Sequence, residues 1–349
     1  MNVTRIIIFV VFSLLVFGLP VWNLFRLRGK KHWLIAIVPV VVFLGIFAGS
    51  SFFEARGFEG GYRLARVLAF YWLIISLILF GMSIPSMLAH YAFKIPKKTT
   101  FWIIIGLTLV YAGAARINGE RVVVKNLELT AENITRDYNF VHITDLHSGS
   151  TDLAHARNVV EKIKPLDPEF MVITGDFIDE YYVTPADIAP FNELDFPIYL
   201  ITGNHEYYLE PGKIQEIIAD SPIQLIDDMK IPFDELDIIG VNELATVDGT
   251  LSNLGGIDDS RYTILLDHQP KEDEAVRASE NGVRLMLSGH THKGQVWPAY
   301  LLMRLQFKYV SGLYEIGNMF LYVNQGTGTL GPKMRLGSVN EITLITLKN

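Results

Sequence analysis

Four long apolar stretches without any charged residue occupy the first third of the chain, at residues 6–25, 33–53, 67–88 and 101–115. A helix of roughly 20 apolar residues matches the ~30 Å hydrocarbon core of a bilayer. We therefore expect an N-terminal bundle of about four transmembrane helices within residues 1–120. The first stretch could instead be a cleavable signal peptide, but its apolar run is long and no small-residue cleavage site follows it. We favour the membrane anchor.

The loops between these stretches predict the orientation of the chain in the membrane. Basic residues without acidic ones follow the first stretch and precede the fourth: Arg26, Arg28, Lys30 and Lys31, then Lys94, Lys97 and Lys98. Short basic loops stay cytoplasmic, so both termini and the remainder of the chain are expected outside the cytoplasm, as in an integral protein of a bacterial cytoplasmic membrane. Arg116, Arg121 and Lys125 oppose this orientation, and one helix fewer would reverse it.

Charge and composition exclude several classes of protein. Residues 1–125 carry 14 basic and 3 acidic side chains, whereas residues 126–349 carry 16 basic and 34 acidic ones. An acidic domain does not favour binding to nucleic acid, which requires basic surface. The absence of Cys excludes disulfides, zinc ribbons and thiol nucleophiles. The apolar stretches also lack the buried ionisable residues that mark a transport path, which disfavours a transporter.

From about residue 138 the pattern changes to short apolar runs separated by helical segments, which is typical of an α/β domain. We expect a linker and a first strand at residues 121–137 and the domain itself at residues 138–349. Strands are predicted at residues 140–144, 171–174, 198–202, 237–241, 262–266 and 283–287, and helices at 152–163, 185–194, 213–219 and 271–280.

Side chains of the metal-binding types follow five of these strands. They are Asp145 and His147, Asp176 and Asp179, Asn204 and His205, His268, and finally His290 and His292. The Asp and Asn residues alone are more simply turn or capping residues, and His268 alone is more simply a satisfied histidine. The alternating His290 and His292 are a stronger signal, because they point the same way from an extended segment. Together the five groups contain five of the nine His residues of the chain, so we expect them at one edge of one sheet, where α/β proteins place their sites.

The order Asp-x-His, Gly-Asp-x-x-Asp, Gly-Asn-His-Glu, His and Gly-His-x-His resembles the calcineurin-like metallophosphoesterase family over roughly residues 138–349. The tail at residues 308–317 and 321–329 is similar to that of the membrane-anchored branch that includes YkuE, YaeI and the transmembrane protein with metallophosphoesterase domain. The resemblance implies a four-layer αββα sandwich. One departure is Lys293, where that branch usually has Gly. We interpret it as solvent-facing, although its ammonium group could instead touch substrate phosphate.

The resemblance also implies two metal ions. Asp145, His147, Asp176 and His292 would hold one ion, and Asp176, Asn204, His268 and His290 the other, with Asp176 bridging. Mixed oxygen and nitrogen ligands suit divalent or trivalent Mn, Fe or Zn. Such a pair of ions turns water into hydroxide for in-line attack on phosphorus. His205 would stabilise the transition state or protonate the leaving group, and Asp179 would keep His205 charged and oriented. We expect Glu206 to support neighbouring groups or to cap a turn rather than to catalyse.

The predicted function is therefore that of a membrane-anchored phosphoesterase, either a phosphatase or a phosphodiesterase. Its expected partners are the lipid bilayer and a phosphoester that is lipid-linked or close to the membrane. The segment at residues 297–308 mixes aromatic, aliphatic and basic side chains, so it lies at a membrane interface or covers the sheet as a core element. Two alternatives remain: a hydrolase of the UDP-diacylglucosamine pyrophosphate, and a non-catalytic binding scaffold with the same fold.

Overall fold

The computed structural model describes residues 13–29 and 33–349 and divides into two compact units. One unit contains the described residues up to Asn118 together with Val296–Ala299. The other contains Gly119–Gln295 and Tyr300–Asn349. The first is helical and apolar, and the second is an α/β unit that carries the predicted metal ligands.

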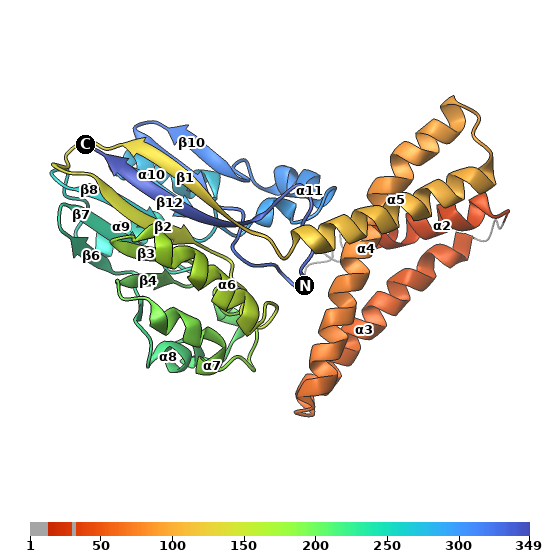
Figure 1. Cartoon of the computed structure of the whole chain (residues 1–349), viewed down its shortest axis with the longest axis horizontal. Helices are drawn as coiled ribbons and strands as arrows, with labels where there is room; N and C mark the ends of the chain where they lie inside the picture. Colours follow the sequence, from red (N-terminus) through yellow and green to blue (C-terminus); the bar gives the residue numbers. More distant parts are fainter. Residues whose placement is uncertain (1–12, 30–32) are drawn as a thin grey trace. The chain divides into compact units, whose positions relative to one another are not determined.

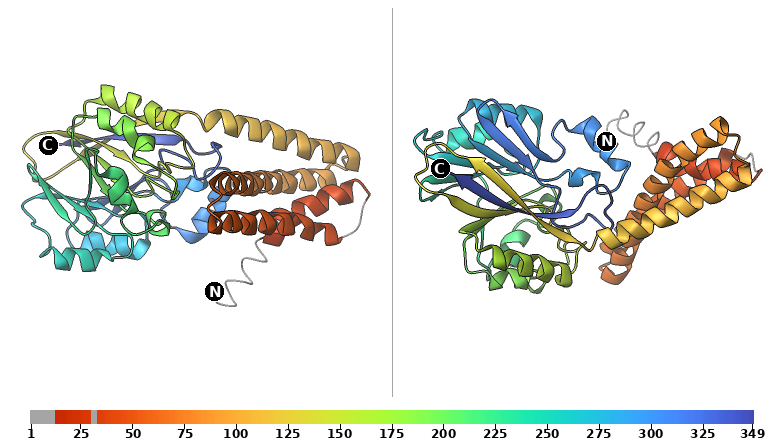
Figure 2. Two further views of the ribbon diagram at one scale, coloured as in Figure 1. Left: turned by 90° about the horizontal axis from the view of Figure 1, so that it is seen from below. Right: turned by 45° about the horizontal axis from the view of Figure 1, so that its top comes forward.

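Among the described residues of the helical unit, three helices are long and apolar enough to cross a membrane: Leu34–Ala55, Glu59–Ala92 and Lys97–Asn118. They correspond to α3 (Ile37–Ala55, entered through the 3-10 turn Trp33–Ala36), α4 (Glu59–Ala92) and α5 (Lys97–Asn118). A shorter apolar helix, Leu14–Leu27, joins the π-helical η1 (Leu14–Gly18) to α2 (Leu19–Leu27). It is the described part of the first predicted span, whose earlier residues lie outside the described ranges. Helix α4 packs along both α3 and α5 (Figure 2).

Two of these helices extend beyond their apolar stretches. Helix α4 begins eight residues before the predicted start at residue 67, and an ion pair between Glu59 and Arg63, one turn apart, supports its first turn. Helix α5 takes Lys97 and Lys98 into its first turn and Arg116 into its last. Hydropathy finds the lipid-facing middle of a helix and misses its polar ends.

The α/β unit contains two six-stranded sheets. The first has the order β1 (Val122–Thr130), β12 (Asn340–Lys348), β2 (Tyr138–Ile143), β3 (Phe170–Thr174), β4 (Ile198–Ile201) and β5 (Ile223–Leu225). The second has the order β10 (Gly312–Ile316), β11 (Met319–Val323), β9 (Leu285–Ser288), β8 (Tyr262–Leu266), β7 (Leu236–Gly240) and β6 (Lys230–Phe233). Strands β2 to β5 are parallel, as are β7, β8, β9 and β11.

Side chains of the buried strands alternate between the two faces of each sheet. One face packs against the other sheet and the opposite face packs against helices, which gives four layers. In β3, Phe170 and Val172 face the second sheet, while Met171 and Ile173 face the helices on the other side. The outer helices of the first sheet are α6 (Leu153–Ile163), α7 (Pro185–Ile188) and α8 (Lys213–Ile218), and those of the second are α9 (Val247–Asn253) and α10 (Glu272–Glu280). Figure 1 shows α6, α7 and α8 on the face of the first sheet away from the second. The αββα sandwich is confirmed.

Candidate metal centre

The predicted ligands come from two sheets, not from one edge of one sheet as the strand pattern suggested. Strands β2, β3 and β4 of the first sheet end just before Asp145, Asp176 and Asn204. Strands β8 and β9 of the second sheet end before His268 and His290. The carboxyl ends of both sets of parallel strands meet at the same end of the sandwich, so all five loops converge.

A first group consists of Asp145, His147 and His292, all buried. The Nε2 atoms of His147 and His292 lie 2.9 Å apart. Asp145 Oδ1 lies 3.3 Å from His292 Nε2 and 3.8 Å from His147 Nε2. One oxygen and two nitrogens thus point at a common position.

A second group consists of Asp176, His268 and His290. His268 Nε2 lies 3.3 Å from Asp176 Oδ2 and 3.2 Å from His290 Nδ1. The Oδ1 atom of Asn204 is 3.2 Å from the same His268 nitrogen. The structure therefore assembles all four residues predicted for the second ion.

Asp176 connects the two groups through a single oxygen. Its Oδ2 lies 3.3 Å from His268 Nε2 in one group and 3.9 Å from His147 Nε2 in the other. Its Oδ1 is occupied elsewhere, because it accepts the backbone N–H of His205 at 2.9 Å. Asp176 would be the residue shared by the two groups if both held an ion.

The residues fit cations because the cluster has more lone pairs than donors. Asp145 Oδ2 accepts the Thr144 hydroxyl at 2.8 Å and the His290 N–H at 2.9 Å. Asp145 Oδ1 is buried and accepts no hydrogen bond from any described residue. A buried carboxylate oxygen without a donor is costly, and two imidazole nitrogens at 2.9 Å repel unless a proton or cation lies beside them. Metal ions would satisfy both.

The backbone is strained at the ligands. Five of them have a left-handed φ between 47° and 68°: Asp145, His147, Asp176, His290 and His292. Non-glycine residues in this region cost of order 1 kcal/mol or more and cluster at functional sites. Glycine allows the loops to approach one another, since a Cβ on Gly289 would lie 2.4 Å from Asp145 Oδ2.

Asp179 lies close to both His147 and His205, since one side-chain ligand atom of each lies within 4.8 Å of the other two. Its Oδ2 lies 3.3 Å from His147 Nδ1, close enough for an ion pair although outside hydrogen-bond geometry, and its Oδ1 accepts the Ser150 N–H at 3.1 Å. The carboxylate therefore orients a predicted ligand, as is common around metal-binding His. Burial lowers the pKa of His147, but Asp179 and the neighbouring carboxylates outweigh it and raise that pKa to about 9.

His205 lies beside the first group, with its ring centroid 4.7 Å from that of His147 and 5.5 Å from that of Tyr208. Burial, followed by the charge of His147, lowers the pKa of His205 to about 4. Its ring is therefore neutral near pH 7 and offers an N–H as a hydrogen-bond donor.

Glu206 clamps two ligand loops together. Its carboxylate accepts the N–H groups of Asp176 at 3.0 Å, Ile178 at 2.9 Å and Gly203 at 2.8 Å. These donors belong to the loops after β3 and β4. Glu206 thus binds backbone donors beside the predicted ligands.

Arg335 is a residue of the site that the strand pattern did not reveal. The side chain is fully buried, and its Nη2 donates to the carbonyl oxygens of Gly328 at 2.6 Å and Gly326 at 3.3 Å and lies 3.1 Å from His292 Nδ1. Its Nη1 donates to the His292 carbonyl at 3.3 Å. The only signal in the sequence is a pair of basic residues, Lys333 and Arg335, in the Gly-rich stretch after residue 324.

Comparisons with known proteins identify similar chains. The profile of the calcineurin-like phosphoesterase family matches residues 138–294. An uncharacterized metallophosphoesterase of Campylobacter jejuni is 31% identical over 265 residues, which cover 70% of this chain and 68% of that protein. The uncharacterized metallophosphoesterase YkuE of Bacillus subtilis is 30% identical over 233 residues, 61% of this chain and 79% of that one.

The name of a third relative includes both a membrane protein and a metallophosphoesterase domain. The transmembrane protein with metallophosphoesterase domain of Bos taurus is 32% identical over 232 residues, which cover 60% of this chain and 52% of that protein. The candidate membrane spans of the described residues agree with that name. The chain thus belongs to the calcineurin-like metallophosphoesterase family.

Proposed function

We propose that the α/β unit hydrolyses a phosphoester with the help of two metal ions. Asp145, His147, Asp176 and His292 would hold one ion, and Asp176, Asn204, His268 and His290 the other. Ligands of this kind, without sulfur, favour Mn, Fe or Zn. The observation that carries the proposal is Asp176 Oδ2, which lies within 4 Å of a ligand nitrogen in each group.

When bound, such ions lower the pKa of water and polarise phosphoryl oxygens. The protein's own contribution is positioning. Asp179 holds the ring of His147 from its Nδ1 side, at 3.3 Å. The backbone of His205 is tied to Asp176 Oδ1, which places its neutral ring beside the first group. We propose that this ring donates a hydrogen bond to a phosphoryl oxygen and stabilises the charge that develops there.

We further propose that the substrate is lipid-linked or close to the membrane. Helix α11 (Ala299–Gln306) follows the loop of His290 and His292 and contains no buried residue. This disfavours the alternative of a core element covering the sheet. Leu301 and Leu305 on this helix are 53% and 85% exposed. The chain continues into buried Phe307, whose ring lies 5.3 Å from that of His290. An exposed apolar surface is therefore only a few residues along the chain from Phe307, which lies against His290.

Metal analysis with two variants tests the catalytic proposal. Asp176→Asn is expected to lose metal and turnover of aryl phosphate mono- and diesters. His205→Ala should keep the wild-type metal content and lose roughly 100- to 10,000-fold in rate. The matched control is Asp195→Asn, an exposed carboxylate before β4 that should change neither quantity. Wild-type metal stoichiometry in an inactive Asp176→Asn protein would show that the bridge is misassigned, and an inactive wild type with two ions would favour a binding scaffold.

Turnover of lipid and soluble substrates tests the second proposal. Leu305→Glu should lower the rate on a phospholipid phosphoester in mixed micelles and leave the rate on a soluble aryl phosphate unchanged. The control is Leu313→Glu, an exposed leucine on β10. Equal rates on both substrates in the wild type, unaffected by Leu305→Glu, would refute a lipid substrate. Phe307 is unsuitable for this test because its buried ring supports His290.

A further inference from the structure

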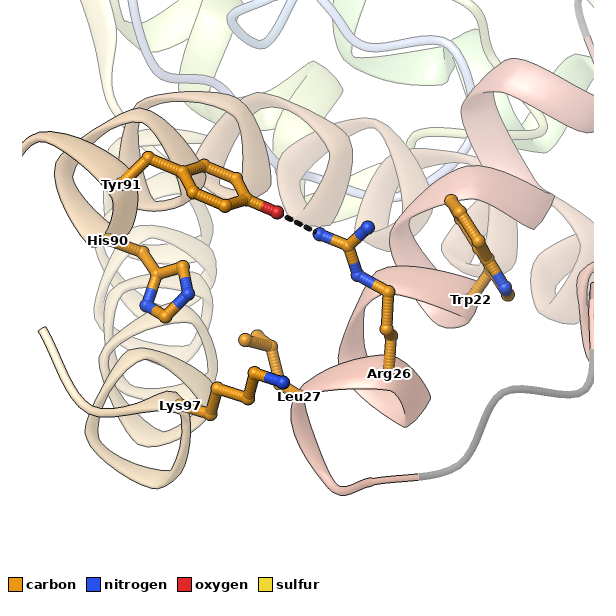
Figure 3. Close-up of a pocket in the computed structure, with 6 residues that line it drawn as sticks. All are labelled: Trp22, Arg26, Leu27, His90, Tyr91 and Lys97. Atoms are coloured by element: carbon orange, nitrogen blue, oxygen red, sulfur yellow. Dashed lines mark hydrogen bonds between the residues drawn. The ribbon is translucent and has the colours of Figure 1, made fainter. Parts of the chain in front are cut away.

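A pocket of about 410 Å³ opens at one end of the helical unit, between α2, the end of α4 and the start of α5 (Figure 3). Its lining residues are Trp22, Arg26, Leu27, His90, Tyr91 and Lys97. All of them belong to the membrane unit, so the pocket is separate from the metal centre. It lies where the two basic loops begin.

The pocket has two cationic side chains, Arg26 and Lys97, and the side chains beside Arg26 are uncharged. Arg26 Nη2 donates to the Tyr91 hydroxyl at 2.5 Å, and the guanidinium lies 5.4 Å from the centroid of the Trp22 ring (Figure 3). Within the described part of the membrane unit, the acidic residues are Glu54 and Glu59, which lie at the opposite end of α4. Within this part of the chain, no carboxylate at this end of α4 balances the positive charge of the pocket, which therefore suits an anionic ligand.

The turn between α4 and α5 holds this arrangement in place. His90 Nδ1–H donates to the Ile95 carbonyl at 2.5 Å, because a carbonyl oxygen can only accept. The Thr100 hydroxyl donates to the Pro96 carbonyl at 3.3 Å. These bonds close the turn directly before Lys97 and fix the start of α5 beside α2.

The surface around the pocket is apolar. Leu88, Tyr91 and Phe93, in the last turn of α4 and just after it, are 66%, 62% and 78% exposed. Trp22 and Tyr91 are residues that concentrate where acyl chains meet headgroups. A ligand with a phosphate group and acyl chains matches both the cationic lining and its apolar rim, whereas a free anion matches only the lining.

We propose that this pocket binds the phosphate of an anionic phospholipid through Arg26 and Lys97, with the acyl chains lying along the end of α4. Basic pockets between membrane helices bind such headgroups, and each Lys or Arg contributes strongly near an anionic surface. This proposal requires that the helical unit lies in a membrane. It does not depend on phosphoester hydrolysis by the α/β unit.

Native mass spectrometry of the full-length protein in detergent tests the proposal. Phosphatidylglycerol should bind more tightly than phosphatidylcholine with the same acyl chains. The double variant Arg26→Gln/Lys97→Gln should weaken phosphatidylglycerol binding by about ten- to thirtyfold. The control Lys94→Gln/Lys98→Gln removes the same number of positive charges, at two residues close to Lys97 that do not line the pocket. It should keep most of the affinity. Circular dichroism verifies helix content, and Lys97→Gln alone, at an exposed position, supplies a milder variant.

Three results would overturn the proposal. Equal loss of affinity in the control variant would mean that binding depends on diffuse loop charge. Equal binding of both lipids would remove the role of the anion. Displacement of phosphatidylglycerol by inorganic phosphate at matching concentration would identify a free-anion site rather than a lipid site.

Discussion

Arg335 shows how one buried charge organises the ligand loops. Its guanidinium donates to three carbonyl oxygens, those of Gly326, Gly328 and His292, and lies against the His292 ring. Burial lowers the pKa of Arg335 to about 10, so it remains charged at neutral pH. A lysine cannot reproduce the planar fork of donors.

We predict that Arg335→Lys lowers metal affinity by roughly 10- to 100-fold, as expected when a group that orients a ligand is lost. Turnover at saturating metal should be largely retained, because the ligands themselves remain. Metal titration followed by activity at each metal concentration measures the two effects. The control is Arg157→Lys, an exposed arginine on α6. A loss of turnover that excess metal does not restore would contradict an orienting role.

Lys293 has a backbone conformation that suits glycine. Its φ is 51°, in the left-handed region, and it lies between His292 and Gly294. We predict that Lys293→Gly raises the free energy of unfolding by roughly 1 kcal/mol without changing metal content. Thermal unfolding of the protein after removal of metal ions measures this change. Lys293→Ala removes the charge and keeps the backbone strain, so it should not raise the free energy of unfolding. Equal stabilisation by both substitutions would show that the side chain, not the backbone, is responsible.

At the scale of elements, strand β2 carries a histidine that must stay neutral. His142 is fully buried, its Nε2 lies 2.9 Å from Thr174 Oγ1, and its Nδ1 has no hydrogen-bond partner among the described residues. Burial lowers the pKa of His142 from 6.5 to about 3. The unfolded chain therefore binds a proton at a higher pH than the folded chain does, so stability is complete above pH 6.5 and is lost as the pH falls toward 3.

We predict that the cation-free wild type loses about 2 kcal/mol more stability than His142→Gln between pH 7 and about pH 5, since each unit of pKa difference corresponds to ~1.4 kcal/mol. Glutamine keeps an amide near Thr174 and has no proton to gain. Thermal unfolding at the two pH values measures the difference. Parallel pH profiles for the two proteins would mean that His142 already carries a proton in the folded state.

The sequence predicts the elements that are buried on both faces and fails where the fold depends on distant pairing. Strands β2, β3, β4, β8 and β9 are visible as apolar runs because both of their faces are covered. The assignment of β8 and β9 to a second sheet is not encoded locally. The position of β12 is not encoded locally either, because its Asn340 pairs with Val122, which lies at the other end of the unit's sequence. The ligands were predictable from their strand ends, while the partner of Asp179 depends on how two loops meet.

At the scale of the whole molecule, the charge asymmetry of the chain bears on where the α/β unit lies. The basic loops carry seven Lys and Arg residues and no acidic ones, whereas residues 126–349 carry 34 acidic against 16 basic side chains. Basic loops stay on the cytoplasmic side, and the lipid pocket proposed above lies at those loops. Anionic headgroups are concentrated on the cytoplasmic leaflet in many membranes. Both expectations rest on the same basic residues, so the orientation needs a direct test.

We predict that the α/β unit lies outside the cytoplasm, and the absence of native Cys makes the test direct. Ser252→Cys, at an exposed position on α9, should react with a membrane-impermeant maleimide in intact cells or spheroplasts. Thr99→Cys, exposed beside Lys97 and Lys98, should react only after the membrane is opened. The Cys-free parent controls for background labelling. The reverse pattern would place the metal centre in the cytoplasm, with soluble nucleotide phosphoesters in reach, and would invert the orientation that the basic loops predict.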